Sequence, residues 1–122
     1  MNGSIKGVGC DIVSVSRIAK LIVDQRFLDN VYTVYEHEYI SENGTQTAAG
    51  LWAAKEAVSK ALGTGFVEFT AKDIEIRHNE SGTPHVILHN GARTRSELMD
   101  VNNVHISISH EKEQAMAFAV IE

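Results

Sequence analysis

The spacing of hydrophobic residues changes halfway along the chain. In the first half, after one apolar run, hydrophobic residues recur at intervals of three and four, whereas in much of the second half they alternate with polar residues. The first spacing is typical of amphipathic helices and the second of strands with one buried face. The sequence therefore predicts one strand, then helices, then mainly hairpin-connected strands.

The apolar run near the start, Ile5 to Val13, predicts a buried strand. Gly7 and Gly9 interrupt it, and glycines within a strand allow another backbone or a ligand to come close. Ser14 follows as a candidate N-cap of a first helix. The apolar residues after this cap have helical spacing: Val15, Ile18, Ala19 and Ile22.

Two further helices are predicted in the first half. Thr33-x-x-Glu36 is a capping-box pattern, which predicts a short helix after Thr33. A longer helix is predicted from about Thr47 to Leu62, and the glycines at 63 and 65 end it. Its apolar stripe consists of Ala48, Leu51, Val58 and Leu62.

A hairpin is predicted in the second half. Residues 73–77 and 85–89 alternate between apolar and polar, and the turn-forming segment Asn79 to Pro84 lies between them. Residues 91–99 then predict one more short helix.

Two strands are predicted at the end of the chain. Residues 104–109 alternate strictly, whereas residues 115–121 are apolar on both faces, as in a strand that is covered on both sides. This order of elements predicts an α+β fold, with helices packed on a mainly antiparallel sheet. At 122 residues the chain fits one domain, spanning residues 1–122.

Composition narrows the class of protein. The hydrophobic fraction of 43% and the charged fraction of 22% are ordinary for a globular protein. The net charge of −5 argues against a protein that coats nucleic acid. Cys10 is the single cysteine, so no intramolecular disulfide is possible. With no signal peptide or membrane-spanning run in the sequence, we expect a cytoplasmic protein.

Glu56 and Lys60 lie one turn apart on the long predicted helix. On spacing alone, the favoured interpretation is an exposed ion pair that stabilises the helix by about 0.2–0.5 kcal/mol. The neighbouring positions are mostly alanine, however, and Trp52 is close by, so this is not an ordinary charge-rich face. A catalytic role for the two residues therefore stays open.

Asp11 stands between the first strand and the first helix. Taken alone, an aspartate there favours a cap or a turn. Brought together with Glu56 and Lys60, it would help to hold a divalent cation and a phosphate. Two carboxylates are too few for a calcium cage but suit Mg²⁺, which shares its shell with water and phosphates. A nearby lysine would neutralise phosphate charge, so the set indicates magnesium-dependent phosphoryl chemistry.

Several familiar motifs are absent. Gly7-x-Gly9 lacks the third glycine of a dinucleotide fingerprint, because position 12 is Ile, and no Gly-Lys-Ser/Thr phosphate loop occurs. The His-Glu pairs at 37–38 and 110–111 lack the second histidine of a zinc protease motif. The serines at 107 and 109 lack a Gly-x-Ser-x-Gly elbow, so their strand face is interpreted as solvated.

Segments along nearly the whole chain carry a family resemblance. They are residues 7–13 with Arg17-Ile18, residues 52–65, residues 73–76 with 82–84, and residues 105–111. The block containing Lys55-Glu56-Ala57 and Ser59-Lys60-Ala61 is the most specific of them. In this order, the segments resemble the holo-[acyl-carrier-protein] synthases, the small bacterial family of 4′-phosphopantetheinyl transferases.

The resemblance implies a reaction and a catalytic set. The reaction transfers 4′-phosphopantetheine from coenzyme A to a serine of apo acyl carrier protein, in fatty acid biosynthesis, and releases adenosine 3′,5′-bisphosphate. Asp11, Glu56 and Lys60 would be catalytic, with Asp11 and Glu56 holding Mg²⁺ against the pyrophosphate. Lys60 would contact the phosphates and favour departure of the bisphosphate.

The resemblance also implies substrate contacts, docking residues and an assembly. The positions that would contact coenzyme A are Lys60, Gly63, Pro84 and His110. Those that would dock an acidic carrier helix are Arg17, Arg26 and Phe27. With Lys20, the two arginines would give this net-acidic chain a local basic face. A homotrimer with active sites between subunits is implied, and the last strand and part of the hairpin are candidates for its interface.

Two positions depart from the family pattern, and two other functions are alternatives. Leu51 replaces an arginine that assists with coenzyme A in many relatives, so another basic residue would have to compensate at the nucleotide end. Cys10 replaces an apolar residue, and we expect it to be a small buried hydrophobe. The first alternative is a non-catalytic coenzyme A or carrier-binding domain of the same fold. The second is another magnesium-dependent nucleotide enzyme, such as a small phosphohydrolase.

Overall fold

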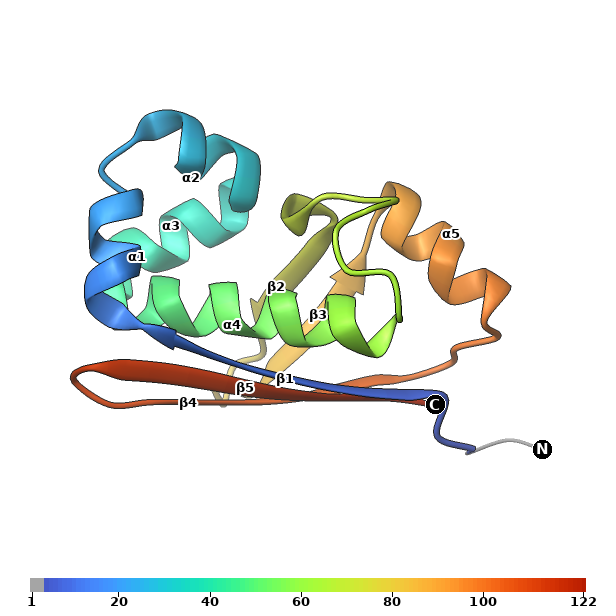
Figure 1. The fold of residues 1–122 in the computed structure, drawn as a ribbon. Helices are drawn as coiled ribbons and strands as arrows, with labels where there is room; N and C mark the ends of the chain where they lie inside the picture. Colours follow the sequence, from blue (N-terminus) through green and yellow to red (C-terminus); the bar gives the residue numbers. More distant parts are fainter. Residues whose placement is uncertain (1–3) are drawn as a thin grey trace.

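The longest helix, α4 (Thr45–Ala61), lies across one face of a three-stranded sheet (Figure 1). The structure is a computed structural model that describes residues 4–122. The sheet has the strand order β1-β5-β4, both pairings being antiparallel. Its strands are β1 (Gly7–Ser14), β4 (Val104–His110) and β5 (Gln114–Ile121). The predicted α+β fold is therefore confirmed.

The remaining elements surround the other side of α4. They are α1 (Val15–Leu21), α2 (Gln25–Val31), α3 (Val34–Asn43), the 3-10 turn η1 (Ala71–Asp73), β2 (Ile74–His78), β3 (Pro84–Leu88) and α5 (Asn90–Leu98). The strands β2 and β3 form the predicted hairpin, but as a separate two-stranded sheet. Of the helices in residues 4–122, none is long and apolar enough to cross a membrane.

Local capping signals position the first helices. The Ser14 Oγ accepts the Arg17 backbone N–H at 3.4 Å, as expected for the cap of α1. The predicted capping box of α3 is also present, because Glu36 N–H donates to Thr33 Oγ1 and Thr33 N–H donates to Glu36 Oε1. The helix α2, which the sequence analysis did not predict, is capped by Asp24.

The glycines of β1 allow the backbone of α4 to approach it. A Cβ atom at Gly9 would lie 2.0 Å from the carbonyl oxygen of Ala57, and one at Gly7 would lie 2.0 Å from that of Ala61. No side chain fits into such a gap, so the interpretation that a second backbone passes close to this strand is confirmed. This contact fixes the position of α4 along β1.

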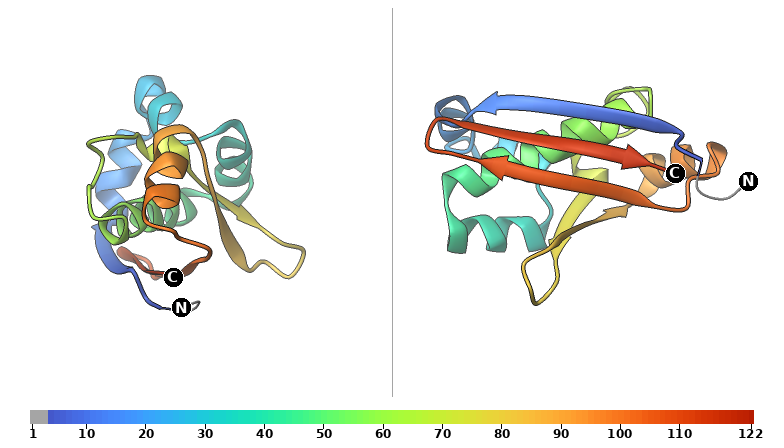
Figure 2. Two further views of the ribbon diagram at one scale, coloured as in Figure 1. Left: turned by 90° about the vertical axis from the view of Figure 1, so that its right-hand side faces the viewer. Right: turned by 90° about the horizontal axis from the view of Figure 1, so that it is seen from below.

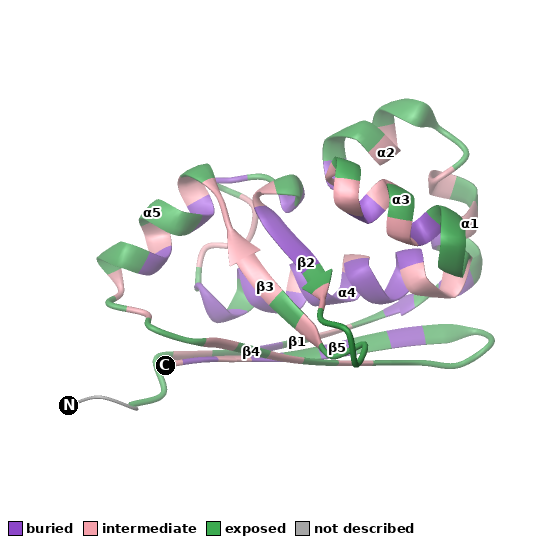
Figure 3. Cartoon of the chain, turned by 180° about the vertical axis from the view of Figure 1, so that it is seen from behind, coloured by how far each residue is buried: buried purple, intermediate pink, exposed green. Residues whose placement is uncertain are grey.

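The three-stranded sheet is covered on one face only. The alanines of β5 that face α4 are buried, whereas the opposite face is formed by apolar side chains that are between 48% and 60% exposed: Val8, Ile12, Met116 and Phe118. Figure 2 (right) shows this uncovered face, and Figure 3 shows burial alternating along β5. Burial of both faces was therefore wrong for the single chain, and so was burial of Cys10, which is exposed.

Candidate active site

Asp11 and Lys60 meet where the middle of β1 passes the last turn of α4. The Lys60 Nζ lies 3.2 Å from Asp11 Oδ1 and donates to the Cys10 carbonyl oxygen at 2.9 Å. Asp11 pairs with Ala117 in the sheet, so it lies within the strand. The interpretation of Asp11 as a cap or turn residue is therefore wrong, and its carboxylate is available beside α4.

Glu56 lies one turn before Lys60 on α4 and is half-buried. Burial and the negative charge of Asp11 raise the pKa of the Glu56 carboxyl, whereas the positive charges of Lys60 and Arg17 oppose this shift. Lys60 forms its ion pair with Asp11 and none with Glu56 among the described residues. The interpretation of Glu56 and Lys60 as an exposed ion pair is therefore wrong.

The pair of carboxylates fits a divalent cation that is bound by oxygen. Their mutual repulsion favours a positive charge between them, and Lys60 and Arg17 offset part of it. Among residues 4–122, no group of three or more His, Cys, Asp or Glu side chains is placed to hold a metal. Further ligands would therefore come from water or substrate, as Mg²⁺ prefers.

A pocket at the other end of α4 brings together two of the positions implied for coenzyme A. Pro84 and His110 both line it, together with Gly50 and Leu51 from α4 and His78 from the hairpin. Leu51 is almost fully buried. At position 51, where the family pattern has arginine, the apolar side chain of Leu51 forms part of the pocket wall. His78 and His110 are the basic residues that line the pocket.

Gly63 lies just beyond the end of α4, away from this pocket. Twelve residues separate it from Leu51, which is about 18 Å along a helix. The Arg95 Nε donates to the Leu62 carbonyl oxygen at 2.9 Å, which brings this arginine of α5 beside Gly63. Arg95 is not among the site residues predicted from the sequence. Within one chain, therefore, Lys60 and Gly63 form one group of positions, and Pro84 and His110 form another.

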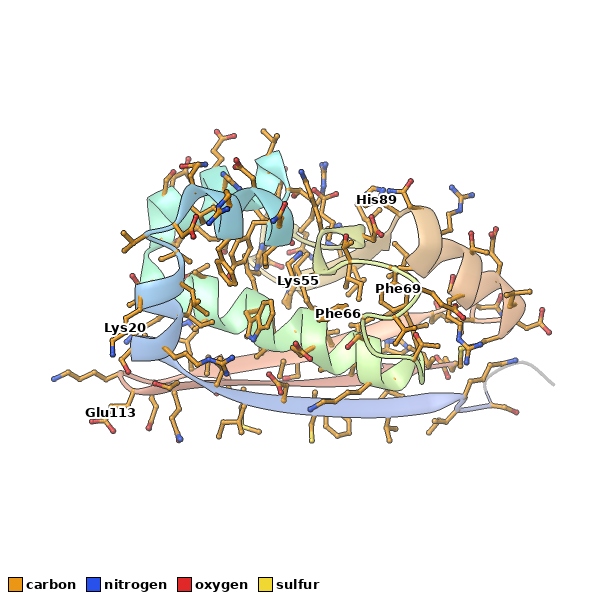
Figure 4. All side chains as sticks on the ribbon, turned by 45° about the horizontal axis from the view of Figure 1, so that its top comes forward. Lys20, Lys55, Phe66, Phe69, His89 and Glu113 are labelled. Atoms are coloured by element: carbon orange, nitrogen blue, oxygen red, sulfur yellow. The ribbon has the colours of Figure 1, made fainter. Side chains whose placement is uncertain are left out.

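The positions implied for carrier docking lie on α1 and α2. Arg17 and Arg26 are exposed, as is Lys20, which projects from α1 in Figure 4. Phe27 is half-buried, and its ring packs 5.8 Å from that of Trp52, centroid to centroid. Arg17, Lys20 and Arg26 are therefore exposed cationic residues on these two helices. Phe27, beside them, packs against the core.

Like Arg95, Lys55 is a residue for which the sequence predicted no role. Its side chain is fully buried, and its Nζ lies 2.8 Å from Glu36 Oε1. Its position in the sequence indicates this burial, because Lys55 comes four residues after Leu51 and three before Val58 and so lies on the apolar stripe of the helix. A lysine at such a position has to be paired inside the protein.

Comparisons with known proteins agree on one family. A sequence model described as the 4′-phosphopantetheinyl transferase superfamily matches residues 7–119. The chain is 48% identical to the holo-[acyl-carrier-protein] synthase of Clostridium perfringens, over 97% of this chain and 94% of that protein.

Solved structures resemble the fold closely. The holo-[acyl-carrier-protein] synthase of Neisseria meningitidis matches with a TM-score of 0.88 and 32% identity, over 98% of this chain and 99% of that one. The Helicobacter pylori enzyme, solved in complex with coenzyme A, matches with a TM-score of 0.84 and 30% identity, over 94% of this chain and 99% of that one.

Proposed function

The chain belongs to the 4′-phosphopantetheinyl transferase superfamily, and we propose that its reaction requires Mg²⁺ and that Asp11 and Glu56 hold this ion. It transfers 4′-phosphopantetheine from coenzyme A to a serine of apo acyl carrier protein and releases adenosine 3′,5′-bisphosphate. The magnesium proposal rests on one observation. The carboxylates of Asp11 and Glu56 lie close enough to interact at the contact between β1 and α4, with Lys60 beside them.

Bound Mg²⁺ would neutralise charge on the pyrophosphate of coenzyme A and make its β-phosphorus a better electrophile. Lys60 is held by Asp11 and the Cys10 carbonyl, so its ammonium group is presented beside the carboxylates. We assign to Lys60 the contact with the phosphates and the stabilisation of the departing bisphosphate, because a fixed cation there stabilises developing negative charge.

Glu56 is the candidate general base. The carrier serine hydroxyl attacks the β-phosphorus in line, and Glu56 accepts its proton directly or through a water molecule. Without a metal ion, burial and the charge of Asp11 raise the pKa of the Glu56 carboxyl. Bound Mg²⁺ would lower it again, so the assignment of Glu56 as the base rests on its position beside Asp11 and Lys60.

The nucleotide end of coenzyme A is assigned to the pocket lined by Pro84 and His110. Lys60 and Gly63 lie toward the opposite end of α4, so a single chain does not join the two groups into one pocket. A second copy of the chain would complete the site if its pocket faced the Lys60 end of the first. This division supports an assembly with active sites between subunits.

We propose that the uncovered sheet face joins three copies of the chain. Cross-strand pairing places Ile12 opposite Met116, and Cys10 opposite Phe118, on this face. Such a contiguous apolar surface is typical of a subunit interface. Phe118→Asp should therefore yield a smaller species in solution, as measured by sedimentation equilibrium. Leu98→Asp, at an exposed position on α5, is the control and should leave the mass unchanged. A wild-type protein that sediments as a monomer would contradict the trimer.

Carrier docking is assigned to Arg17, Arg26 and Phe27. Because the carrier helix is acidic, Arg26→Glu should raise the KM for the carrier about tenfold, with little change in kcat. Arg93→Glu is the matched control, since Arg93 is also exposed but lies on α5. Steady-state transfer rates at varied carrier concentration would measure both. Equal KM values for Arg26→Glu and the wild type would rule out docking at this position.

One experiment tests the reaction and its metal together. The protein is mixed with coenzyme A and apo acyl carrier protein, with either Mg²⁺ or a chelator, and the carrier is examined by mass spectrometry. The phosphopantetheine mass should appear with Mg²⁺ and be absent with the chelator. Equal transfer in both samples would refute the magnesium proposal. No adduct on any of several carriers would favour the binding-only alternative.

A further inference from the structure

We infer that Lys55 is a positioning residue for the coenzyme A pocket: with Glu36, it fixes the β2–β3 hairpin against α4. The inference rests on the proposed function, because it takes the pocket lined by Pro84 and His110 as the site of coenzyme A. It assigns to the buried ion pair a role in substrate binding, distinct from the chemistry of Asp11, Glu56 and Lys60.

Every hydrogen of the Lys55 ammonium group has an acceptor. The Nζ donates to Glu36 Oε1 at 2.8 Å, to the Ala71 carbonyl at 3.0 Å and to the Ile74 carbonyl at 2.7 Å. Burial lowers the pKa of Lys55, and the Glu36 carboxylate opposes this shift. Three acceptors match the three hydrogens of a charged ammonium group. Figure 4 shows Lys55 on the side of α4 that faces away from the three-stranded sheet.

Glu36 completes the contact with the hairpin. Its Oε2 accepts the Ile76 backbone N–H at 2.7 Å, while Lys55 binds the Ile74 carbonyl two residues earlier on β2. In the described residues β2 pairs with one strand, β3. The ion pair therefore binds the backbone groups of β2 that a third strand would otherwise bind. Because two of its contacts are to backbone atoms of β2, the ion pair fixes the strand itself.

The same hairpin supplies one wall of the pocket. His78, Gly82 and Pro84 come from β2, β3 and their connecting turn, whereas Gly50 and Leu51 come from α4. The width of the pocket therefore depends on the position of the hairpin relative to α4.

The catalytic groups are positioned independently of the hairpin. Glu56 and Lys60 are placed by the packing of α4 on β1, at Gly7 and Gly9. Loss of Lys55 should therefore weaken binding of coenzyme A more than it slows the chemical step.

The first variant is Lys55→Met, assayed for transfer at saturating carrier and Mg²⁺. We expect the KM for coenzyme A to rise about ten- to hundredfold, since a small displacement of positioning groups has effects of this size. The kcat should stay within about threefold of the wild-type value. The Tm should also fall, because Glu36 is left as an unpaired buried carboxylate.

The double variant Glu36→Gln/Lys55→Met separates positioning from stability. Removal of both charges should recover part of the lost Tm, because no buried charge is then left unpaired. The carbonyls of Ala71 and Ile74 still lack their cation, so the KM for coenzyme A should stay raised and the Ile76 amide should exchange its hydrogen faster than in the wild type. Ile18→Ala, at a fully buried position in α1, is the control and should lower the Tm with an unchanged KM for coenzyme A.

Recovery of both the Tm and the KM in the double variant would show that the pair has only a structural role and would overturn the inference. An unchanged KM in a folded Lys55→Met protein would overturn it as well. If Lys55→Met does not fold, the double variant supplies the same comparison. Failure of the wild-type protein to transfer phosphopantetheine would instead refute the proposed function.

Discussion

Glu56→Gln should abolish transfer while leaving the fold intact. The substitution removes a proposed metal ligand and the candidate proton acceptor together, so we expect kcat to fall at least about 10²–10⁴-fold, the range for loss of a general base alone. Single-turnover transfer in saturating Mg²⁺, followed by the mass of the carrier, measures the effect. Glu97→Gln on α5 is the control, because that side chain is exposed and remote from the pair. Near-normal turnover of Glu56→Gln in Mg²⁺ would contradict its assignment.

The same variant should not be less stable than the wild type. The pKa of Glu56 is raised in the folded protein, so its stabilising contribution is present below the unfolded pKa and is lost as the pH rises through the folded pKa. When ionised, the Glu56 carboxylate is half-buried and repelled by Asp11, a cost that glutamine does not carry. The Tm of Glu56→Gln in metal-free buffer should therefore equal or exceed that of the wild type. A clear drop in Tm would indicate a structural role for the carboxylate.

Gly9→Ala should be among the most destabilising single substitutions in the chain. The added Cβ would lie 2.0 Å from the Ala57 carbonyl oxygen, which belongs to helix backbone and cannot rotate away. The helix has to move off the strand, and we expect a loss of about 3 kcal/mol or more, at the upper end of overpacking effects. Urea unfolding measures this loss.

Gly9→Ala should also reduce transfer in the protein that remains folded. Asp11 lies on β1, whereas Glu56 and Lys60 lie on α4, so a shift between these elements separates the proposed catalytic groups. A displacement of about 1 Å is enough for a loss of about 10²-fold. Gly65→Ala is the control: nothing lies within 4 Å of its added Cβ, and only its positive φ is unfavourable, at a cost of about 1–2 kcal/mol. Equal stability of the two variants would contradict the close approach of strand and helix.

Most of the fold followed from local patterns, for identifiable reasons. Signals that act over a few residues can be recognised in the sequence. They are the capping box at Thr33 and Glu36, the helical stripe before Gly63 and the alternation on either side of the 79–84 turn. The short helix α2 was missed because its seven residues span about two turns, too few for a helical spacing of apolar residues to repeat. The apolar residues of β5 predicted burial of both faces, but the single chain covers only one of them. The sequence pattern cannot distinguish burial within one chain from burial against a second copy.

The sequence by itself determined the order of elements apart from α2 and η1, and a family resemblance in which Asp11, Glu56 and Lys60 work together. Spacing alone favoured Asp11 as a turn residue, and Glu56 with Lys60 as a surface ion pair. Only the tertiary structure decided that Lys60 pairs with Asp11 across 49 positions and that Lys55 pairs with Glu36 inside the protein. The physical reason is that helix and hairpin patterns depend on near neighbours. Charge pairing, in contrast, depends on which distant backbones come into contact, and here two glycines of β1 allow that contact.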